Sequence, residues 1–225
     1  PTLLYDGPFA DAVLNRKSQL LKNAEHISRE NAREIAARAL GCNISEAIYS
    51  GEDAGNMPCY TFTYSQKTAG ITKSGGYVAY VLYGGKINRF SIDKDNAINL
   101  AQSYLKNIGY KNMANTYYAI NNNVCVINFA YKKDDVTYYS DLIKVGVSMD
   151  NGKIVSLEAQ GYLTNHIKRK AFNCKLTKEH AQSKLSKNLK VINSKRCVIP
   201  KESGNEVNCY EFRCKSNDTK EEVLI

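Results

Sequence analysis

Three histidines, His26, His166 and His180, are the residues of this sequence best suited to acid–base chemistry. A catalytic histidine works within hydrogen-bond reach of the group whose proton it moves. None of the three stands in a pattern with an identifiable nucleophile. His180 falls in the first turn of a predicted helix, and His26 falls just before a predicted helix cap. We therefore expect both of these side chains at the surface.

Adjacent acidic residues and paired glycines have structural explanations. Asp134–Asp135 and Glu221–Glu222 are sequence neighbours, and neighbours on a strand point to opposite faces, which suits a shared acid–base site poorly. We assign Asp134–Asp135 to a hairpin turn. Gly75–Gly76 and Gly84–Gly85 lack the following Lys-Ser/Thr and the helix of a phosphate-binding loop. The sequence thus predicts no catalytic, cofactor-binding or metal-binding residue, and it leaves partner-binding residues unassigned.

The seven cysteines offer nucleophiles, metal ligands or disulfides. They are Cys42, Cys59, Cys125, Cys174, Cys197, Cys209 and Cys214. No pair forms CxxC, no Cys–His spacing matches a zinc site, and no environment that lowers a thiol pKa is evident. We interpret them as small buried hydrophobic residues in a reducing setting. Their odd number leaves at least one thiol free unless it pairs between chains. A hairpin disulfide between Cys197 and Cys209 is the alternative.

The net charge of +9 fits nucleic acid, an anionic membrane, an anionic cell-wall polymer or no specific partner. The densest basic run, His166–Lys170, is short, and no arginine-rich arm or zinc pattern accompanies it, so we predict no nucleic-acid partner. No segment approaches the ~18 apolar residues of a membrane span. The chain begins at Pro1 without a signal peptide. We therefore expect a fragment or processed product, with any anchor or export signal upstream.

Three segments open alike and predict the elements that position these residues. They are Ser28–Ala32, Asp93–Ala97 and Thr177–Ala181. Each starts with an N-cap residue and places an acid two positions later, where the helix dipole favours it. Apolar residues then recur at helical spacing, as in a helix that covers a sheet. In the third copy these are Ala181, Leu185 and Leu189. Gly41 and Gly109 end the first two helices, and Asn188 takes that role in the third.

Strand-like sequence follows each helix. The matching strands are Cys59–Phe62, Val126–Phe129 and Cys209–Phe212, and they lie at nearly constant spacing. The distance is 30 residues from Ala32 to Phe62, 32 from Ala97 to Phe129, and 31 from Ala181 to Phe212. A second hairpin closes the first two units. In copy two it joins 145–149 to 153–157 through Asp150-Asn151-Gly152, and in copy one it joins 78–83 to 86–90 through Gly84–Gly85.

The sequence therefore predicts an α+β fold of three tandem units, each a helix packed on a four-stranded antiparallel sheet, with the third unit incomplete. The predicted divisions are a lead-in segment and helix at 1–27, with the helix near 9–23, and units at 28–92, 93–165 and 174–225. Residues 165–174 form a basic linker or exposed connection. Each unit is marginal alone, so we expect the units to pack together. The missing last hairpin predicts an exposed sheet edge that can pair with another chain.

A helix with two hairpins in tandem copies resembles the PepSY domain. The opening Pro1–Phe9 is similar to the entry into the PepSY region of the YpeB family of spore germination proteins, and Gly161–His166 resembles that family's exit from its second repeat. The resemblance covers essentially the whole chain. Seven cysteines and a truncated third unit depart from the family pattern. The opening residues Tyr5, Asp6 and Phe9 are interpreted as structural, fixing the first helix onto unit one.

The resemblance implies a non-catalytic, soluble ectodomain without cofactors, on the outer face of the inner spore membrane or in the cortex of the spore envelope. Its implied partner is a SleB-like cortex-lytic enzyme, which it stabilises or restrains until germination. Direct binding to peptidoglycan, as a scaffold of the spore envelope, is the alternative function. Homo-oligomers through sheet edges are a further expectation, and an undetected hydrolase is the third functional hypothesis.

Overall fold

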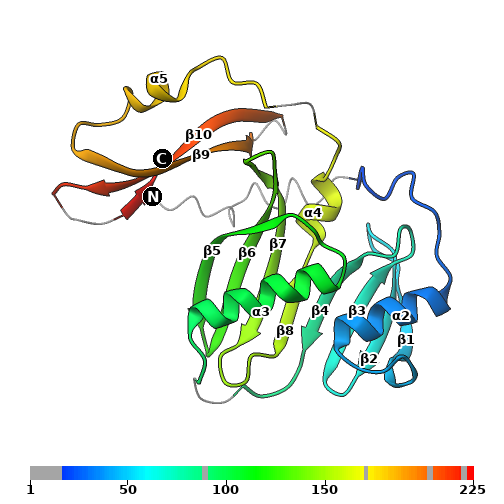
Figure 1. The fold of residues 1–225 in the computed structure, drawn as a ribbon. Coiled ribbons are helices and arrows are strands. Elements are labelled where there is room, and N and C mark those ends of the chain that lie inside the picture. Colours follow the sequence, from blue (N-terminus) through cyan, green and yellow to red (C-terminus); the bar gives the residue numbers. More distant parts are fainter. Residues whose placement is uncertain (1–16, 88–90, 170–171, 202–204, 219–221) are drawn as a thin grey trace.

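The chain forms an α+β fold, as predicted, in a computed structural model that describes residues 17–87, 91–169, 172–201, 205–218 and 222–225. Helices are few, and the strands form one large mixed sheet. Figure 1 shows two long helices on one face of this sheet, and the last two long strands, which belong to the same sheet, lie across one end of it. Among the described residues, no helix combines the length and apolar character needed to cross a membrane.

The helix α2 (Arg29–Leu40) begins and ends where the sequence predicted. The Ser28 hydroxyl accepts a hydrogen bond from the Asn31 backbone N–H at 3.1 Å, satisfying a donor that the first turn leaves free. Gly41 ends the helix with φ at +74°, which glycine adopts without a Cβ clash. The buried face consists of Ala32, Ala36, Ala37, Ala39 and Leu40. These small side chains let the helix lie close to the sheet.

Four antiparallel strands follow α2 after one turn of 3₁₀ helix at Ile44–Glu46. They are β1 (Ile48–Asp53), β2 (Cys59–Tyr64), β3 (Lys67–Thr72) and β4 (Val78–Tyr83). Each pairs with the next, so they form a meander. The predicted strand at 59–62 lies within β2.

The predicted pairing of 78–83 with 86–90 is wrong. Strand β4 pairs with β3 on one edge and with a strand of the second meander on the other, which leaves no edge for a hairpin partner. Residues 86 and 87 lie outside any strand, and 88–90 lie outside the described residues. The turn before β4 is made by Gly75 and Gly76, with φ at +78° and +66°. Two glycine pairs flank this strand, and the pair before it supplies the hairpin turn.

The helix α3 (Lys94–Asn107) also starts at its predicted cap. The Asp93 carboxylate accepts from the Asn96 backbone N–H at 2.8 Å. Gly109 follows the helix end with φ at +97°. The side chains of Ala97, Ala101 and Leu105 are fully buried. This is the apolar stripe that the sequence predicted, facing the sheet.

A second meander follows α3. Its strands are β5 (Met113–Asn121), β6 (Val124–Lys133), β7 (Val136–Ser148) and β8 (Ile154–Glu158). Asp134 and Asp135, with φ at +50° and +61°, turn β6 into β7. Gly152, with φ at +72°, lies in the turn from β7 to β8. Both turns confirm the predictions made for these residues.

The two meanders join edge to edge through β4 and β8. Tyr80, Val81 and Leu82 pair with Glu158, Leu157 and Ser156 in an antiparallel ladder. One apolar core runs beneath both meanders and both long helices. Polar groups reinforce the join, since the Tyr110 hydroxyl donates to the Val78 carbonyl at 2.8 Å and the Tyr104 hydroxyl donates to the Ala39 carbonyl at 2.9 Å. The short helix α4 (Gln160–Asn165) closes this core beside β7 and β4.

The last third of the chain carries a much shorter helix than the sequence predicted. Helix α5 (Lys178–Gln182) starts at its predicted cap, Thr177, but has no buried residue. Leu185 lies beyond the helix, and Leu189 opens a strand. The predicted stripe of Ala181, Leu185 and Leu189 is therefore wrong, and Asn188 does not end a helix. Three apolar positions among serines and lysines give a helix little surface to bury.

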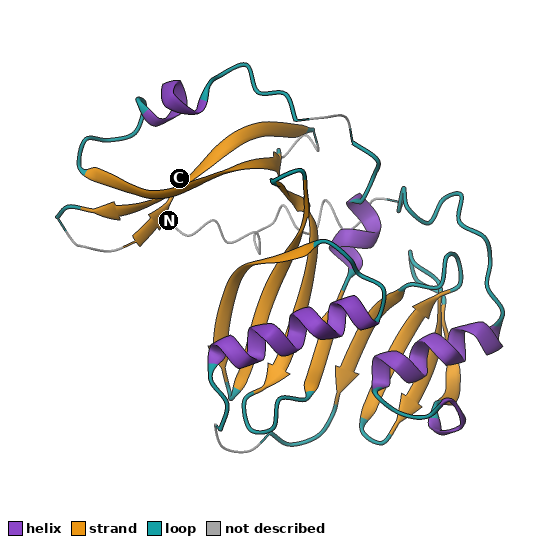
Figure 2. Cartoon of the chain, viewed as in Figure 1, coloured by secondary structure: helices purple, strands orange, loops and turns teal. Residues whose placement is uncertain are grey.

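The strands β9 (Leu189–Pro200), β10 (Glu206–Ser216) and β11 (Glu222–Leu224) form the last antiparallel set. Figure 2 shows α5 as a short helix beside the long strands. β9 joins the second meander by a parallel ladder, in which Val136, Thr137 and Tyr138 of β7 pair with Arg196, Cys197 and Val198. β6 occupies one edge of β7, so β8 and β9 share the other edge, near opposite ends of that strand.

The predicted lead-in helix near 9–23 is not present in its described part. Residues 19–23 form turns, and residues 1–16, which include Tyr5, Asp6 and Phe9, lie outside the described residues. The following segment is tied to the β3–β4 turn. Ile27 N–H donates to the Lys73 carbonyl at 2.9 Å, and Gly75 N–H donates to the Glu25 carbonyl at 2.8 Å.

Candidate functional site

The three histidines occupy different environments. His26 and His180 are exposed, as predicted, and His26 lies 3.5 Å from the Ser74 hydroxyl. His166 is different, because its Nδ1 lies 2.6 Å from Oδ2 of Asp141, a fully buried carboxylate. Its ring stacks on Tyr162 with centroids 4.4 Å apart. A residue of the densest basic run therefore reaches the interior.

Arg169, three residues further on, holds two carboxylates at once. Its guanidinium donates to both oxygens of Asp141, at 2.8 and 2.6 Å, and to both oxygens of Glu206, at 2.8 and 2.6 Å. The Ser140 hydroxyl also donates to Glu206 at 2.7 Å. Bidentate pairing of this kind uses the fixed fork of the guanidinium. We call Asp141, His166, Arg169 and Glu206 the charged cluster.

The charged cluster corrects part of the predicted exposed connection at 165–174, because Ile167, Lys168 and Asn173 are exposed but His166 and Arg169 turn inward. The Arg169 side chain is only 9% exposed and that of Asp141 is 0% exposed. A buried carboxylate needs a partner, so the chain after α4 turns inward to supply one. The sequence carries one signal of this, since Asp141 interrupts a strand otherwise rich in aromatic and β-branched residues. Its partner was not evident, because Arg169 is 28 residues away.

The electrostatics of the charged cluster favour fixed charges over proton transfer. Burial opposes the charge of Arg169, but its hydrogen bonds to Glu206 and Asp141 raise the pKa of the guanidinium above its ordinary value. Burial likewise opposes ionisation of Glu206, yet the hydrogen bonds from Arg169 and Ser140 hold the pKa of that carboxyl below its usual range. Groups tuned in these directions stay charged near neutral pH. The cluster is thus suited to positioning β10 against β7 and α4.

A second polar contact and a few apolar side chains complete the junction between β7 and the strands β9 and β10. The Tyr139 hydroxyl donates to Glu211, and Lys195 Nζ lies 3.0 Å from the same carboxylate. Burial and the neighbouring Glu211 raise the pKa of Tyr139. The apolar part is small and consists of Val136, Tyr138 and Val198, with Tyr131 and Phe172 against them.

The cysteines largely fit the prediction that they are small buried hydrophobic residues. Four are buried and three half-buried, and all seven are free thiols. The alternative, a disulfide in this hairpin, has geometric support, because Cys197 and Cys209 lie directly opposite each other on β9 and β10 with their sulfurs 3.4 Å apart. Their hydrogen bond, with burial, raises the pKa of Cys197, and the same bond lowers the pKa of Cys209. Within the described ranges, no group of three or more His, Cys, Asp or Glu side chains could hold a metal ion.

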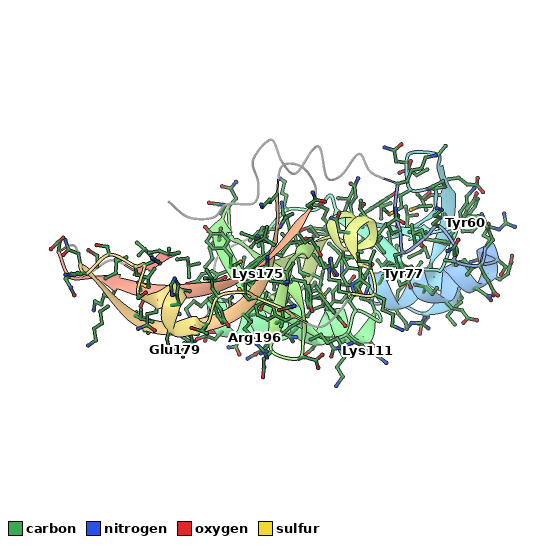
Figure 3. All side chains as sticks on the ribbon, turned by 90° about the horizontal axis from the view of Figure 1, so that it is seen from above. Tyr60, Tyr77, Lys111, Lys175, Glu179 and Arg196 are labelled. Carbon is green, nitrogen blue, oxygen red and sulfur yellow. The ribbon has the colours of Figure 1, made fainter. Side chains whose placement is uncertain are left out.

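A cleft of about 650 Å³ opens beside the junction, between β5–β7 and β9–β10 with α5 on its rim. Its lining residues are Ala114, Asn115, Thr116, Lys132, Asp135, Thr137, Lys178, Asn193, Ser194, Lys195, Arg196 and Tyr210. We call it the basic cleft, because four of these are Lys or Arg and one is acidic. Figure 3 labels Arg196 between Glu179 and Lys111 along one long side of the molecule. Sequence reasoning missed this cleft, since its walls come from three segments.

Comparison with known proteins identifies relatives among sporulation proteins. The family model described as "YpeB sporulation, PepSY1 and PepSY2 domains" matches residues 1–172. Sporulation protein YpeB of Halalkalibacterium halodurans is 29% identical over 205 residues, covering 88% of this chain and 46% of that protein. Sporulation protein YpeB of Bacillus subtilis is 28% identical over 197 residues, covering 84% and 44%. The chain therefore spans less than half the length of these curated relatives.

A solved structure shares the fold. The Bacillus megaterium YpeB C-terminal domain aligns with a TM-score of 0.75 at 26% sequence identity. The alignment covers 89% of this chain and 98% of that one. The likeness extends across nearly all of the chain, beyond the residues that the family model matches.

Proposed function

This chain belongs to the family of YpeB sporulation proteins, and from that membership we propose that it binds a SleB-like cortex-lytic enzyme and stabilises or restrains that enzyme until germination. We infer a non-catalytic role. The charged cluster supports this, because Arg169 holds both Asp141 and Glu206 in ion pairs and the Ser140 hydroxyl donates to Glu206. A general acid or base needs a pKa near the working pH.

The finer architecture of this proposal is three tandem PepSY-like units. The order α2 then β1–β4, α3 then β5–β8, and α5 then β9–β11 supports the division at 28–92, 93–165 and 174–225. Among the described residues the third set has three strands, where the others have four. On this view the first two units form the continuous part of the sheet made by β1–β8, which we call the fused sheet, and the third unit adds β9–β11 to it.

The single observation that best supports a protein partner is the open edge of β5. Within the described part of the chain, β6 is the only strand that pairs with β5, so the other edge of this nine-residue strand has no strand partner; at its start the Met113 carbonyl accepts from the Gln102 side chain. Tyr117, Tyr118 and Ile120 on this strand are 41%, 39% and 39% exposed. An edge with exposed aromatic side chains suits strand addition by a partner. We propose that the enzyme, or a second copy of this chain, pairs along such an edge.

A pull-down of the purified chain against the cortex-lytic enzyme, with hydrolysis of cortex assayed in the same tube, tests the proposal. Binding with reduced hydrolysis is the expected result. Replacing Tyr117 and Tyr118 with lysine should weaken binding, because charges on the edge oppose pairing. Leu82→Lys is the matched control, since Leu82 is 57% exposed but lies on an interior strand. Full binding by the edge variant would move the contact elsewhere, and no binding by the unaltered chain at any salt would defeat the proposal.

The basic cleft supports a second candidate function, direct binding to peptidoglycan as a scaffold of the spore envelope. Cationic side chains gathered in a polar cleft attract an anionic polymer, and salt screens that attraction. Retention of the chain on isolated cortex should therefore fall steeply as ionic strength rises. Absence of retention even at low salt would remove this candidate. Release of reducing sugar from the same cortex would contradict the non-catalytic assignment.

We place the chain in the spore envelope, on the outer face of the inner spore membrane or in the cortex, because its relatives are sporulation proteins. Fractionation of dormant spores tests this placement. Detection of the protein in the spore core alone would contradict it.

A further inference from the structure

The walls of the basic cleft come from separate parts of the chain. β5 contributes Asn115 and Thr116, and β6 and β7 contribute Lys132 and Thr137. The opposite wall is β9 with Tyr210 of β10, and Lys178 projects from the first turn of α5. A hollow formed where three segments meet is a common place for a binding site.

The charges in the basic cleft are unbalanced and only partly satisfied. Lys132 pairs with Asp135 at 3.1 Å, and Lys195 pairs with Glu211 at 3.0 Å. Arg196 donates through Nη2 to the Asp134 carbonyl at 2.6 Å, a neutral group. In the part of the chain that the structure describes, no carboxylate lies within ion-pair distance of Lys178. Lys132 and Asp135 balance each other on the β5–β7 wall, so an anionic ligand would meet net positive charge mainly from Lys178, Lys195 and Arg196 on the opposite wall.

The neutral part of the lining is rich in hydrogen-bonding groups. Asn115, Asn193, Thr116, Thr137 and Ser194 bring amides and hydroxyls. Tyr210 adds an aromatic ring, which is held edge-on to Phe172 with centroids 6.0 Å apart. Amides, hydroxyls and a fixed aromatic ring match the hydroxyl-covered and apolar faces of sugar rings. Three of the four cations are lysines, which act as point charges toward any anionic group, so the amides, hydroxyls and aromatic ring are what point to a saccharide.

We propose that the basic cleft is a binding site for a carboxylate-bearing oligosaccharide. The lysines and Arg196 pair with the ligand's carboxylates, and the amides, hydroxyls and Tyr210 receive its sugar rings. This inference deepens the second candidate function, direct binding to a wall polymer, and rests on it for its biological setting. It assigns that function to one place on the molecule.

The test uses short oligogalacturonate as a soluble probe, with binding measured by calorimetry at low ionic strength. The double variant Lys132→Gln with Lys178→Gln removes one cation from each wall. The matched control is Lys133→Gln with Lys175→Gln, which makes the same charge change at exposed neighbours outside the cleft. The cleft variant should bind about tenfold more weakly or worse, and the control should bind like the unaltered chain. Equal losses in both variants would mean diffuse charge attraction and would overturn the proposal.

Two further probes sharpen the ligand class. A neutral dextran oligomer of similar length should not bind, because it lacks the carboxylates. Inorganic tripolyphosphate or a short oligonucleotide that binds the cleft more tightly than oligogalacturonate would overturn the assignment to a saccharide. All four positions changed in the variants are exposed, so both double variants should fold, and circular dichroism verifies this.

Retention on isolated cortex separates failure of the site from failure of the function. If the unaltered chain and the cleft variant are retained equally, wall binding stands and the cleft proposal fails. If oligogalacturonate binds the cleft while cortex retains neither form, the site stands and the second candidate function fails.

Discussion

Two junctions between strands hold the parts of this molecule together. They have the same number of paired residues but differ in the side chains that support them. β4 meets β8, and β7 meets β9, each through three residue pairs. The first junction lies over a continuous apolar core shared by both long helices. The second has an apolar cluster of only three buried side chains, and it relies on the charged cluster and on the Tyr139–Glu211–Lys195 contact.

This difference predicts which parts of the chain unfold as one cooperative unit. Apolar burial is non-directional and insensitive to pH, so the two meanders should unfold together. Ion pairs hold a geometry, yet each depends on every partner remaining in place and charged. The set β9–β11 should therefore be separable from the fused sheet by changes that leave the fused sheet intact. Four changes test this comparison.

Removing the central cation should have the largest effect. Arg169→Ala leaves the fully buried Asp141 without its bidentate partner, which costs about 3–5 kcal/mol. Hydrogen exchange should show faster exchange in β9 and β10 and unchanged protection in β2 and β3. Adding Asp141→Asn should recover part of the loss, because the orphaned charge is then gone. Lys168→Ala, at an exposed neighbour, is the control. Equal loss of protection in every strand would show that the junctions are not separable.

Cutting into the apolar junction should have a global effect. Leu157→Ala removes a side chain 1% exposed that pairs with Val81, at a cost of about 2–5 kcal/mol. Urea unfolding should report this loss as one cooperative transition of both meanders. Leu82→Ala, one position along the same ladder but 57% exposed, should change stability by less than about 0.5 kcal/mol. Two separate transitions in the Leu157 variant would break the comparison.

Oxidation should stabilise the hairpin of β9 and β10, which is attached through the charged junction. A thiol oxidant such as diamide takes two electrons and two protons from Cys197 and Cys209 and leaves a disulfide across β9 and β10. Cys209 is the more accessible of the two thiols, since it is half-buried and Cys197 is buried. Closing this short loop stabilises the hairpin by about 3 kcal/mol or less.

Trypsin digestion checks the predicted linkage. Residues 197–201 and 202–213 should appear as one linked species that reduction separates. Cys125 and Cys214, both fully buried, should remain thiols and serve as internal controls. Scrambled linkages to these two would count against a preformed pair.

Acid should produce the smallest effect, confined to the charged junction. The folded-state pKa of Glu206 lies below its usual value, so its contribution is present above the ordinary glutamate pKa and is lost as pH falls through the folded pKa. Asp141, Arg169, His166 and Ser140 face this part of the junction. Protection of β9 and β10 should therefore fall only below the ordinary glutamate pKa, as the pH approaches the folded-state pKa of Glu206. Glu206→Gln should remove that part of the pH dependence; an unchanged pH profile would contradict the assignment.

Much of the fold followed from the sequence because its signals are local. An N-cap such as Ser28 or Asp93, with an apolar stripe behind it, specifies a helix within a few residues. The Asp134–Asp135 and Gly152 turns are equally local. The third helix failed because an N-cap alone, at Thr177, cannot sustain a helix that has nothing to bury.

The candidate site was largely beyond sequence reasoning. Arg169 stood in a basic run that suggested a solvated linker, and its partners Asp141 and Glu206 are 28 and 37 residues away. Such partners become visible only when the fold brings β7 and β10 together. The basic cleft depends in the same way on tertiary placement, since no short segment contains more than part of its lining.

The arrangement of two ladders on one edge of β7 affects how the molecule would respond to a pulling force. It is thirteen residues long, and it carries β8 near its C-terminal end and β9 at its N-terminal end on one edge. A pull on the C-terminal part of the chain would thus load the short parallel ladder and the charged cluster before it strained the eight antiparallel strands. The ladder between β7 and β9 would separate first, and the fused sheet would remain folded.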